Sequence, residues 1–120
     1  MSELADIYSA MDVSVLCPRT AGCPRAVLEA MAARRPVVAA RVGGIPEILQ
    51  DGETGRLIEG RDPALFAEAI EPLLNDEAEA RRLGEAAHAY VREHLSADRM
   101  ADACRQLYAE LLIRAARTGR

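Results

Sequence analysis

A single carboxylate, Glu29, interrupts the otherwise apolar helical segment 26–33. A helix that is apolar on every side is a buried one, so this carboxylate is either partly desolvated or directed at a crevice from about one turn inside. The competing interpretation is a solvent-facing glutamate paired with Arg25 or with Arg34. The chemistry open to this carboxylate is to accept two hydrogen bonds from a vicinal diol such as ribose.

Glycine occurs in two loops that each follow a strand-like run, as Gly22 and as the pair Gly43 and Gly44. Strands joined by helical crossovers are parallel, so both loops emerge at the C-terminal edge of one sheet, where open α/β sheets bind their ligands. Glycine lets the backbone approach a ligand closely, and the helix that begins near Pro24 offers N–H groups to an anion such as phosphate. We therefore expect the two loops to line one crevice.

Three strand-like runs alternate with helical patterns and must position these residues. The predicted strands are residues 13–17, 37–40 and 56–58, and the predicted helices between and before them are residues 2–11, 25–34 and 45–50. This alternation predicts an α/β fold, half of a Rossmann-like domain with a three-stranded parallel sheet and flanking helices.

From residue 62 onward the pattern is helical. Asp62 and Ser96 are predicted N-caps, and helices are expected over residues 63–74, 77–94 and 97–117. Pro72 predicts a kink or a frayed end in the first of these helices, whose inward stripe includes Leu65 and Leu74. We expect part of the apolar face of the last helix to be exposed. The chain is thus predicted to be a single domain, 1–120, with strand–loop–helix units over 1–60 and helices over 61–120.

The composition excludes several classes of function. The net charge is -4, the fifteen cations are all arginine and are scattered, and only one Phe and three Tyr are present, so nucleic acid is not an expected partner. The three cysteines show no C-x-x-C spacing, and no disulfide framework, metal or cofactor is expected. No apolar run could span a bilayer, and the first ten residues hold acids where a signal peptide needs bases, so we expect a cytoplasmic protein.

Several motifs occur together in a fixed order. They are RTAGCPRAVLEAMA (19–32), RPVVA (35–39), VGGIPEI (42–48), DGETG (51–55), DP (62–63) and RLG (82–84). In this order they resemble the C-terminal domain of the group 1 (family 4) glycosyltransferases, and the resemblance covers nearly the whole chain. It implies the GT-B architecture, in which the second of two Rossmann-like domains holds most of a nucleotide-sugar donor and the sugar is transferred with retention at the anomeric carbon.

The resemblance also implies roles for particular residues. The family uses a pair of glutamates eight positions apart. The second binds the ribose hydroxyls and corresponds to Glu29, whereas the first contacts the transferred sugar and corresponds to Ala21, so no catalytic residue is assigned. Gly22 and Cys23 occupy positions whose N–H groups face the donor. With Gly43 and Gly44 they complete the expected site for a UDP-, GDP- or ADP-sugar.

The sequence departs from the family pattern around the same loop. Pro18, Cys23, Arg25 and Arg34 replace a common serine, an aromatic residue, an asparagine and a glycine. In length the chain corresponds to the second half of the donor domain with its terminal helices. One edge of the sheet is therefore predicted to be free, and we expect self-association or docking on a partner that supplies the other half.

Two functions are compatible with these features. The first is the donor-binding portion of a retaining, hexosyl-type glycosyltransferase, insufficient for catalysis alone and acting on an unknown acceptor. The alternative is a catalytically inactive remnant or interaction module that keeps the fold without donor turnover. A dinucleotide-binding domain is disfavoured because neither G-x-G-x-x-G nor G-x-x-x-x-G-K-[ST] occurs.

Overall fold

A computed structural model describes residues 3–22 and 24–118 of the chain. The three strands are β1 (Ser14–Leu16), β2 (Val37–Ala40) and β3 (Arg56–Ile58). The helices are α1 (Glu3–Ala10), α2 (Arg25–Ala32), α3 (Ile45–Ile48), α4 (Pro63–Asn75), α5 (Glu77–His94) and α6 (Ala97–Arg117). The bounds of β2, β3, α5 and α6 are those that the sequence predicts, and both predicted N-caps accept a backbone N–H through their side chains.

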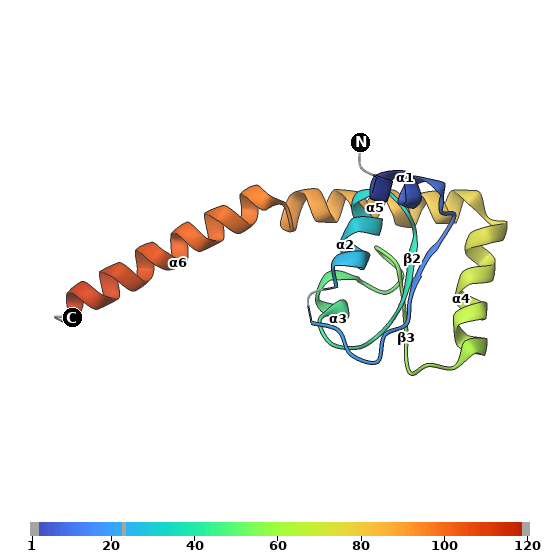
Figure 1. Ribbon diagram of the computed structural model, residues 1–120, viewed down its shortest axis with the longest axis horizontal. Helices are drawn as coiled ribbons and strands as arrows, with labels where there is room; N and C mark the ends of the chain where they lie inside the picture. Colours follow the sequence, from blue (N-terminus) through green and yellow to red (C-terminus); the bar gives the residue numbers. More distant parts are fainter. Residues whose placement is uncertain (1–2, 23, 119–120) are drawn as a thin grey trace.

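The strands form one parallel sheet in the order β1-β2-β3. Ser14 lies opposite Val37, and Val38 lies opposite Arg56. Figure 1 shows α2 and α3 on one side of this sheet and α4 on the other, with α5 crossing above both. The predicted α/β fold with a three-stranded parallel sheet is confirmed.

The central strand β2 is buried on both faces, as parallel strands are when helices cover them. Val37 and Ala39 belong to a core cluster with residues of α1, α2 and α3. Val38 and Ala40 belong to a second cluster, with Phe66 and other residues of α4 and α5. The alternation of side chains along one short strand therefore builds both halves of the core.

The connection between α2 and β2 has a residue with a left-handed backbone. Arg34 has φ 61°, and it is the one non-glycine residue with a positive φ in the described part of the chain. Its carbonyl lies so close to Gly84 of α5 that a Cβ at Gly84 would overlap it. The sequence resemblance placed a glycine of the family at position 34, and the conformation explains why glycine suits it.

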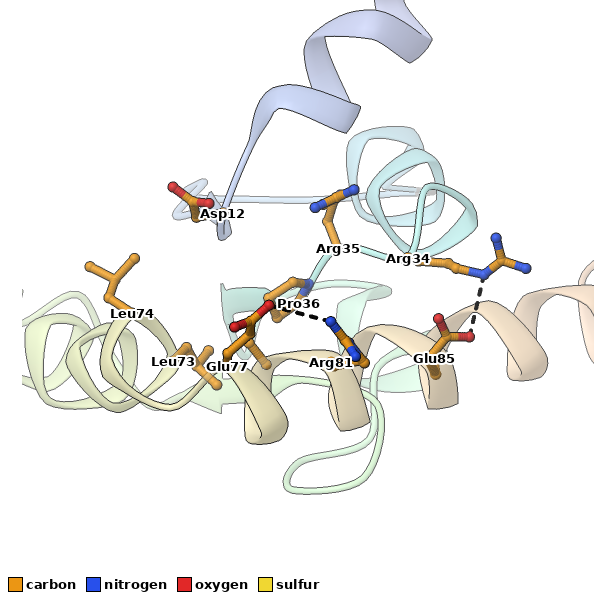
Figure 2. A pocket seen from close by; sticks show the side chains of 10 residues that line it. Asp12, Arg34, Arg35, Pro36, Leu73, Leu74, Glu77, Arg81 and Glu85 are labelled. Carbon is orange, nitrogen blue, oxygen red and sulfur yellow. Dashed lines mark hydrogen bonds and ion pairs between the residues drawn. The ribbon is translucent and has the colours of Figure 1, made fainter.

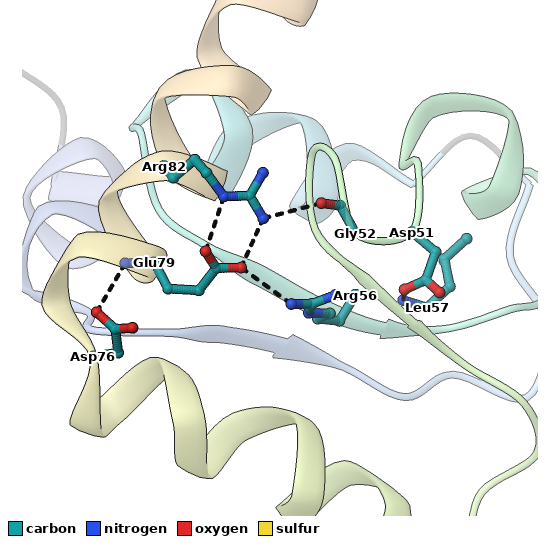
Figure 3. Close-up of polar contacts among 7 residues, drawn as sticks. All are labelled: Asp51, Gly52, Arg56, Leu57, Asp76, Glu79 and Arg82. Carbon is teal, nitrogen blue, oxygen red and sulfur yellow. Dashed lines mark hydrogen bonds and ion pairs between the residues drawn. The ribbon is translucent and has the colours of Figure 1, made fainter.

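The turn before β3 is fixed by polar contacts (Figure 3). Asp51 Oδ1 accepts a hydrogen bond from the Leu57 N–H at 3.0 Å. Glu79 of α5 accepts from Arg56 at 3.1 Å and from Arg82 at 2.7 Å, and Arg82 also donates to the Gly52 carbonyl at 3.1 Å. These contacts tie the first turn of α5 to β3 and to the turn that leads into it.

Part of what the sequence predicts for α4 is wrong. Of the kink or frayed end expected at Pro72, the fraying does not occur: the helix continues to Asn75, Leu73 is buried, and the Asp76 N–H donates to the Pro72 carbonyl at 2.9 Å. Leu65 and Leu74, predicted to face inward, are exposed. The helix packs on β2, β3 and α5 through a narrower stripe that includes Phe66 and Leu73, so the flanks of the predicted stripe stay uncovered.

The molecule is elongated, with extents of 62 × 33 × 25 Å. Its radius of gyration is 17.6 Å, against about 14 Å for a compact domain of this length. The excess comes from α6, which projects from the α/β body (Figure 1) and has no buried residue. The expected exposure of its apolar face is confirmed, since Leu111 and Leu112 are both exposed.

Candidate functional site

The two glycine loops meet at the C-terminal edge of the sheet. The Gly44 N–H donates to the Ala21 carbonyl at 3.0 Å. A Cβ at Gly43, whose φ is 54°, would overlap the Ala21 carbonyl, and a Cβ at Gly44 would overlap the Gly22 carbonyl. The structure thus brings together residues 22, 43 and 44 as the sequence predicts, and two of these glycines are required by the close approach of the loops.

Gly22 faces open space beside this contact. It is exposed, and among the described residues that are not adjacent to it in the chain, none lies within 4 Å of the position its Cβ would take. The next described residue, Pro24, is the N-cap of α2 and provides no side-chain cap. The first N–H groups of α2 therefore stand next to an open glycine loop, an arrangement suited to an anion.

Of the two other loop residues considered from the sequence, the structure describes Ala21 but not Cys23. Ala21 packs its side chain against the core cluster of α1, α2 and α3, and its methyl group has no acid–base or nucleophilic chemistry. Cys23 lies outside the described residues. Within the two described ranges, there is no cluster of three His, Cys, Asp or Glu that could hold a metal ion.

Glu29 lies one turn into α2 with its side chain 31% exposed. Its Oε2 accepts a hydrogen bond from the Tyr8 hydroxyl at 3.1 Å, and its Oε1 lies 3.8 Å from Nη2 of Arg25. Arg34, the other partner considered from sequence, pairs instead with Glu85 at 3.3 Å. The carboxylate is thus partly desolvated, and its arginine contact is long and is made by an 87% exposed side chain.

The carboxylate also lines a cavity of about 270 Å³ between α1 and α2. The other lining residues are apolar or aromatic: Leu4, Ala5, Tyr8, Ala32 and Ala33. Among the described residues that line this largely apolar pocket, Glu29 is the only charged one, and it lies on α2, whose first turn is next to the glycine loops. The structure places it toward α1 rather than among the glycines themselves.

Tyr8 contacts Glu29 of the candidate site, and sequence reasoning missed this contact. Its ring is buried against the α2 face of the core, while its hydroxyl reaches Glu29. Burial is the main cause that raises the pKa of Tyr8, and the hydrogen bond to Glu29 and the charge of Glu29 raise it further. The sequence feature that could have indicated this contact is a tyrosine on an apolar helical face, because a buried phenol needs a hydrogen-bond partner.

A larger cavity, of about 530 Å³, lies at the opposite end of the sheet. Asp12 and residues 34–36, which precede β1 and β2, line it together with residues of α4 and α5 (Figure 2). Its charges are largely paired with each other, Arg34 with Glu85 and Arg81 with Glu77, both at 3.3 Å. Because parallel α/β sheets bind ligands at their C-terminal edge, this cavity is not the candidate site.

Comparison with known families identifies the chain. The model of the family described as "Glycosyl transferases group 1" matches residues 1–76, more than half of the sequence. The chain belongs to the group 1 glycosyltransferases. This confirms the resemblance drawn from the motifs between residues 19 and 84, and the fold agrees with a part of the C-terminal domain of a GT-B glycosyltransferase.

Individual relatives agree with this assignment. The glycosyltransferase chain is 44% identical over 85 residues to a D-inositol 3-phosphate glycosyltransferase of Corynebacterium diphtheriae, covering 71% of this chain and 20% of the relative. Among solved structures, sucrose-phosphate synthase from Thermosynechococcus elongatus superposes with a TM-score of 0.86 at 34% identity, covering 92% of this chain and 28% of that one.

A second solved structure contains a nucleotide. HepE from Anabaena, solved in complex with UDP, matches with a TM-score of 0.70 at 25% identity, covering 90% of this chain and 29% of that one. The glycosyltransferase chain thus spans about a fifth to under a third of the length of these three relatives. In the described residues, no helix is both long and apolar enough to cross a membrane.

Proposed function

We propose that this chain is the donor-binding portion of a retaining glycosyltransferase and that it binds the nucleotide part of a nucleotide-sugar. The observation that carries the proposal is the meeting of the Gly22 and Gly43–Gly44 loops beside the first turn of α2. Small residues and free N–H groups are what a diphosphate requires of a backbone cradle. The complex of the related HepE with UDP supports a nucleoside diphosphate as the ligand.

Each site residue has a distinct part in this proposal. Gly22 leaves room for the diphosphate and the sugar, Gly43 and Gly44 allow their loop to lie close beside it, and the expectation for Cys23 is a backbone contact at the same loop. Glu29 accepts hydrogen bonds from the ribose hydroxyls through its partly exposed carboxylate. In the transfer, the bond from the anomeric carbon to the diphosphate oxygen breaks, a bond to an acceptor oxygen forms, and the proton of the acceptor hydroxyl passes to the departing diphosphate.

Ala21 favours binding over turnover in this chain. Its methyl group offers no carboxylate at the position where the family contacts the transferred sugar. We therefore propose no catalytic residue among the described residues, and a catalytically inactive, nucleotide-binding module is the second candidate. Release of sugar from a donor, measured with the chain alone and with the rest of a donor domain added, separates the two functions.

The free edge of β1 completes the proposal. Within residues 3–22 and 24–118, β1 pairs with β2 and with no other strand, and Val15 in its middle is 47% exposed. Parallel strands are normally buried on both faces, so this strand is suited to a further parallel strand and a covering helix. We propose that the other half of a donor domain, supplied by a partner segment, docks on this edge.

A titration of backbone amide resonances with UDP, GDP and ADP tests donor binding. We expect saturable shifts at Gly22, Gly43 and Gly44 with at least one nucleotide. The Glu29→Ala variant should weaken this binding about tenfold, as expected when a hydrogen-bonded charged partner is removed. A well-dispersed spectrum that millimolar nucleotide leaves unchanged would contradict the proposal and favour an interaction module.

A further inference from the structure

The ring of Tyr8 joins α1 to α2. The side chain is only 8% exposed and belongs to the same core cluster as Val27, Ala30 and Met31 of α2. Its position is therefore determined by packing and does not depend on a ligand. Because the ring is packed in the core, the position of the Tyr8 hydroxyl is fixed as well.

The Tyr8 hydroxyl has two acceptors within reach. It lies 3.1 Å from Glu29 Oε2 and 3.4 Å from the Ala26 carbonyl oxygen. A phenol has one proton to donate, and a hydrogen bond to a charged acceptor is the stronger one. The shorter distance agrees with donation to Glu29. The raised pKa of Tyr8 keeps the hydroxyl protonated at neutral pH.

The two carboxylate oxygens of Glu29 therefore differ. Oε2 is held by a buried donor, whereas Oε1 is 3.8 Å from an arginine side chain that is almost fully exposed. An exposed ion pair of that length contributes little and is easily replaced. Oε1 is the oxygen left for a ligand, and its position is set through Oε2.

Resting on the proposed function, we infer that Tyr8 is a positioning residue for nucleotide binding: it fixes the Glu29 carboxylate so that Oε1 meets a ribose hydroxyl. Without the Tyr8 hydroxyl, Glu29 loses its buried donor and samples other side-chain rotamers. The ligand must then order the carboxylate on binding, which lowers affinity. The loss falls on the ribose contact and not on the diphosphate contact.

The experiment compares UDP with 2′-deoxy-UDP, because only UDP has both ribose hydroxyls. Four chains are titrated and followed by amide resonances: wild type, Tyr8→Phe, Glu29→Ala and the control Tyr108→Phe. Phenylalanine keeps the buried ring at position 8, and Tyr108 undergoes the same change on the exposed face of α6. Wild type is expected to prefer UDP over 2′-deoxy-UDP.

Tyr8→Phe should weaken UDP binding about fivefold, the loss typical of one hydrogen bond. It should weaken 2′-deoxy-UDP binding less, so the preference for UDP over 2′-deoxy-UDP should fall. Tyr108→Phe should leave both affinities unchanged. If Tyr8→Phe lowers the affinity for both nucleotides equally, the Tyr8 hydroxyl has a merely structural role. If it changes neither affinity, the hydroxyl has no role in nucleotide binding. Both results overturn the inference while leaving nucleotide binding established.

A second measurement does not need a ligand. Three-bond couplings of the Glu29 side chain report its rotamers, and we expect one dominant rotamer in wild type and an averaged set in Tyr8→Phe. An unchanged rotamer distribution overturns the inference whatever the titrations give. Absence of UDP, GDP and ADP binding by wild type would instead overturn the proposed function and, with it, the role of Tyr8.

Discussion

At the scale of single residues, the site depends on contacts between residues that are distant in sequence. Gly43 and Gly44 must lack side chains because the carbonyls of Ala21 and Gly22 occupy the space. The Glu29 carboxylate is partly exposed and accepts a hydrogen bond from Tyr8, which lies 21 residues away in the sequence. The residue types were visible in the sequence, but the pairing of Tyr8 with Glu29 was not.

Arg34 offers a test of backbone conformation at this scale. Its φ of 61° costs a side-chain-bearing residue roughly 1–2 kcal/mol and costs glycine almost nothing. We expect the free energy of unfolding of Arg34→Gly to be about 1 kcal/mol higher than that of Arg34→Ala. This figure allows for the greater conformational entropy that glycine gives the unfolded chain. Urea denaturation of both variants measures the difference.

Arg34→Ala is the matched control because both variants lose the ion pair between Arg34 and Glu85. The comparison therefore isolates the backbone from the charge. A glycine variant less stable than the alanine variant would contradict the left-handed conformation at this position.

At the scale of elements, the first turn of α5 is joined to β3 by a charged network. Glu79 accepts from Arg82 and from Arg56, and Arg82 also holds the turn that leads into β3. These residues are partly exposed, so each pair is weak alone and the network acts mainly by fixing the register of α5 on the sheet. The RLG motif contributes Arg82 to this network and Gly84 to the close contact with Arg34.

The same network predicts a pH dependence. The hydrogen bond from Arg82 chiefly lowers the pKa of Glu79 below its ordinary value of 4.5, with the charges of Arg82 and Arg56 adding to it and burial opposing it. A lowered pKa contributes stability that is present above the ordinary pKa and is lost as pH falls through the folded-state pKa. Glu79→Gln should therefore lower the urea midpoint at pH 7, and its difference from wild type should shrink as the pH falls below 4.5 and through the folded-state pKa.

The control for this prediction is Glu77→Gln in the same helical turn. Glu77 pairs only with the exposed Arg81 and is itself 88% exposed, so its substitution should change the midpoint less at every pH. Added salt should shrink the Glu79 effect because the network is accessible to ions. An effect of Glu79→Gln that stays the same as the pH falls far below 4.5 would show that the carboxylate charge is not its cause.

At the scale of the whole molecule, two of the exposed apolar surfaces in the described residues could bind another chain. One is β1, whose free edge and exposed Val15 continue a parallel sheet. The other is α6, which projects from the body with exposed side chains such as Leu107, Leu111 and Leu112 (Figure 1). A hydrogen-bonding edge with an apolar face is the more specific of the two, because it offers backbone partners as well as apolar area.

The chain is therefore expected to self-associate through β1 as its concentration rises. Light scattering should show a mass that increases with concentration for wild type, and Val15→Lys should remain monomeric because a lysine on an edge strand opposes pairing. The matched control is Leu112→Lys on α6, which should associate like wild type. Strictly monomeric wild type at high concentration, or loss of association only in Leu112→Lys, would contradict a role of the β1 edge.

The sequence by itself determined the order and type of the elements, the parallel sheet, the N-caps Asp62 and Ser96, and the neighbourhood of the two glycine loops. These features follow from local periodicity, from capping chemistry and from the geometry of crossovers, all of which can be read from nearby residues.

Only the tertiary structure decided which surfaces are covered. It buried Tyr8 beside Glu29, gave Arg34 a positive φ against Gly84, and left Leu65 and Leu74 exposed. Helical periodicity identifies an apolar stripe, but its buried width depends on the neighbours that pack against it. A side-chain hydrogen bond between two helices likewise depends on how those helices meet, which no short segment of sequence specifies.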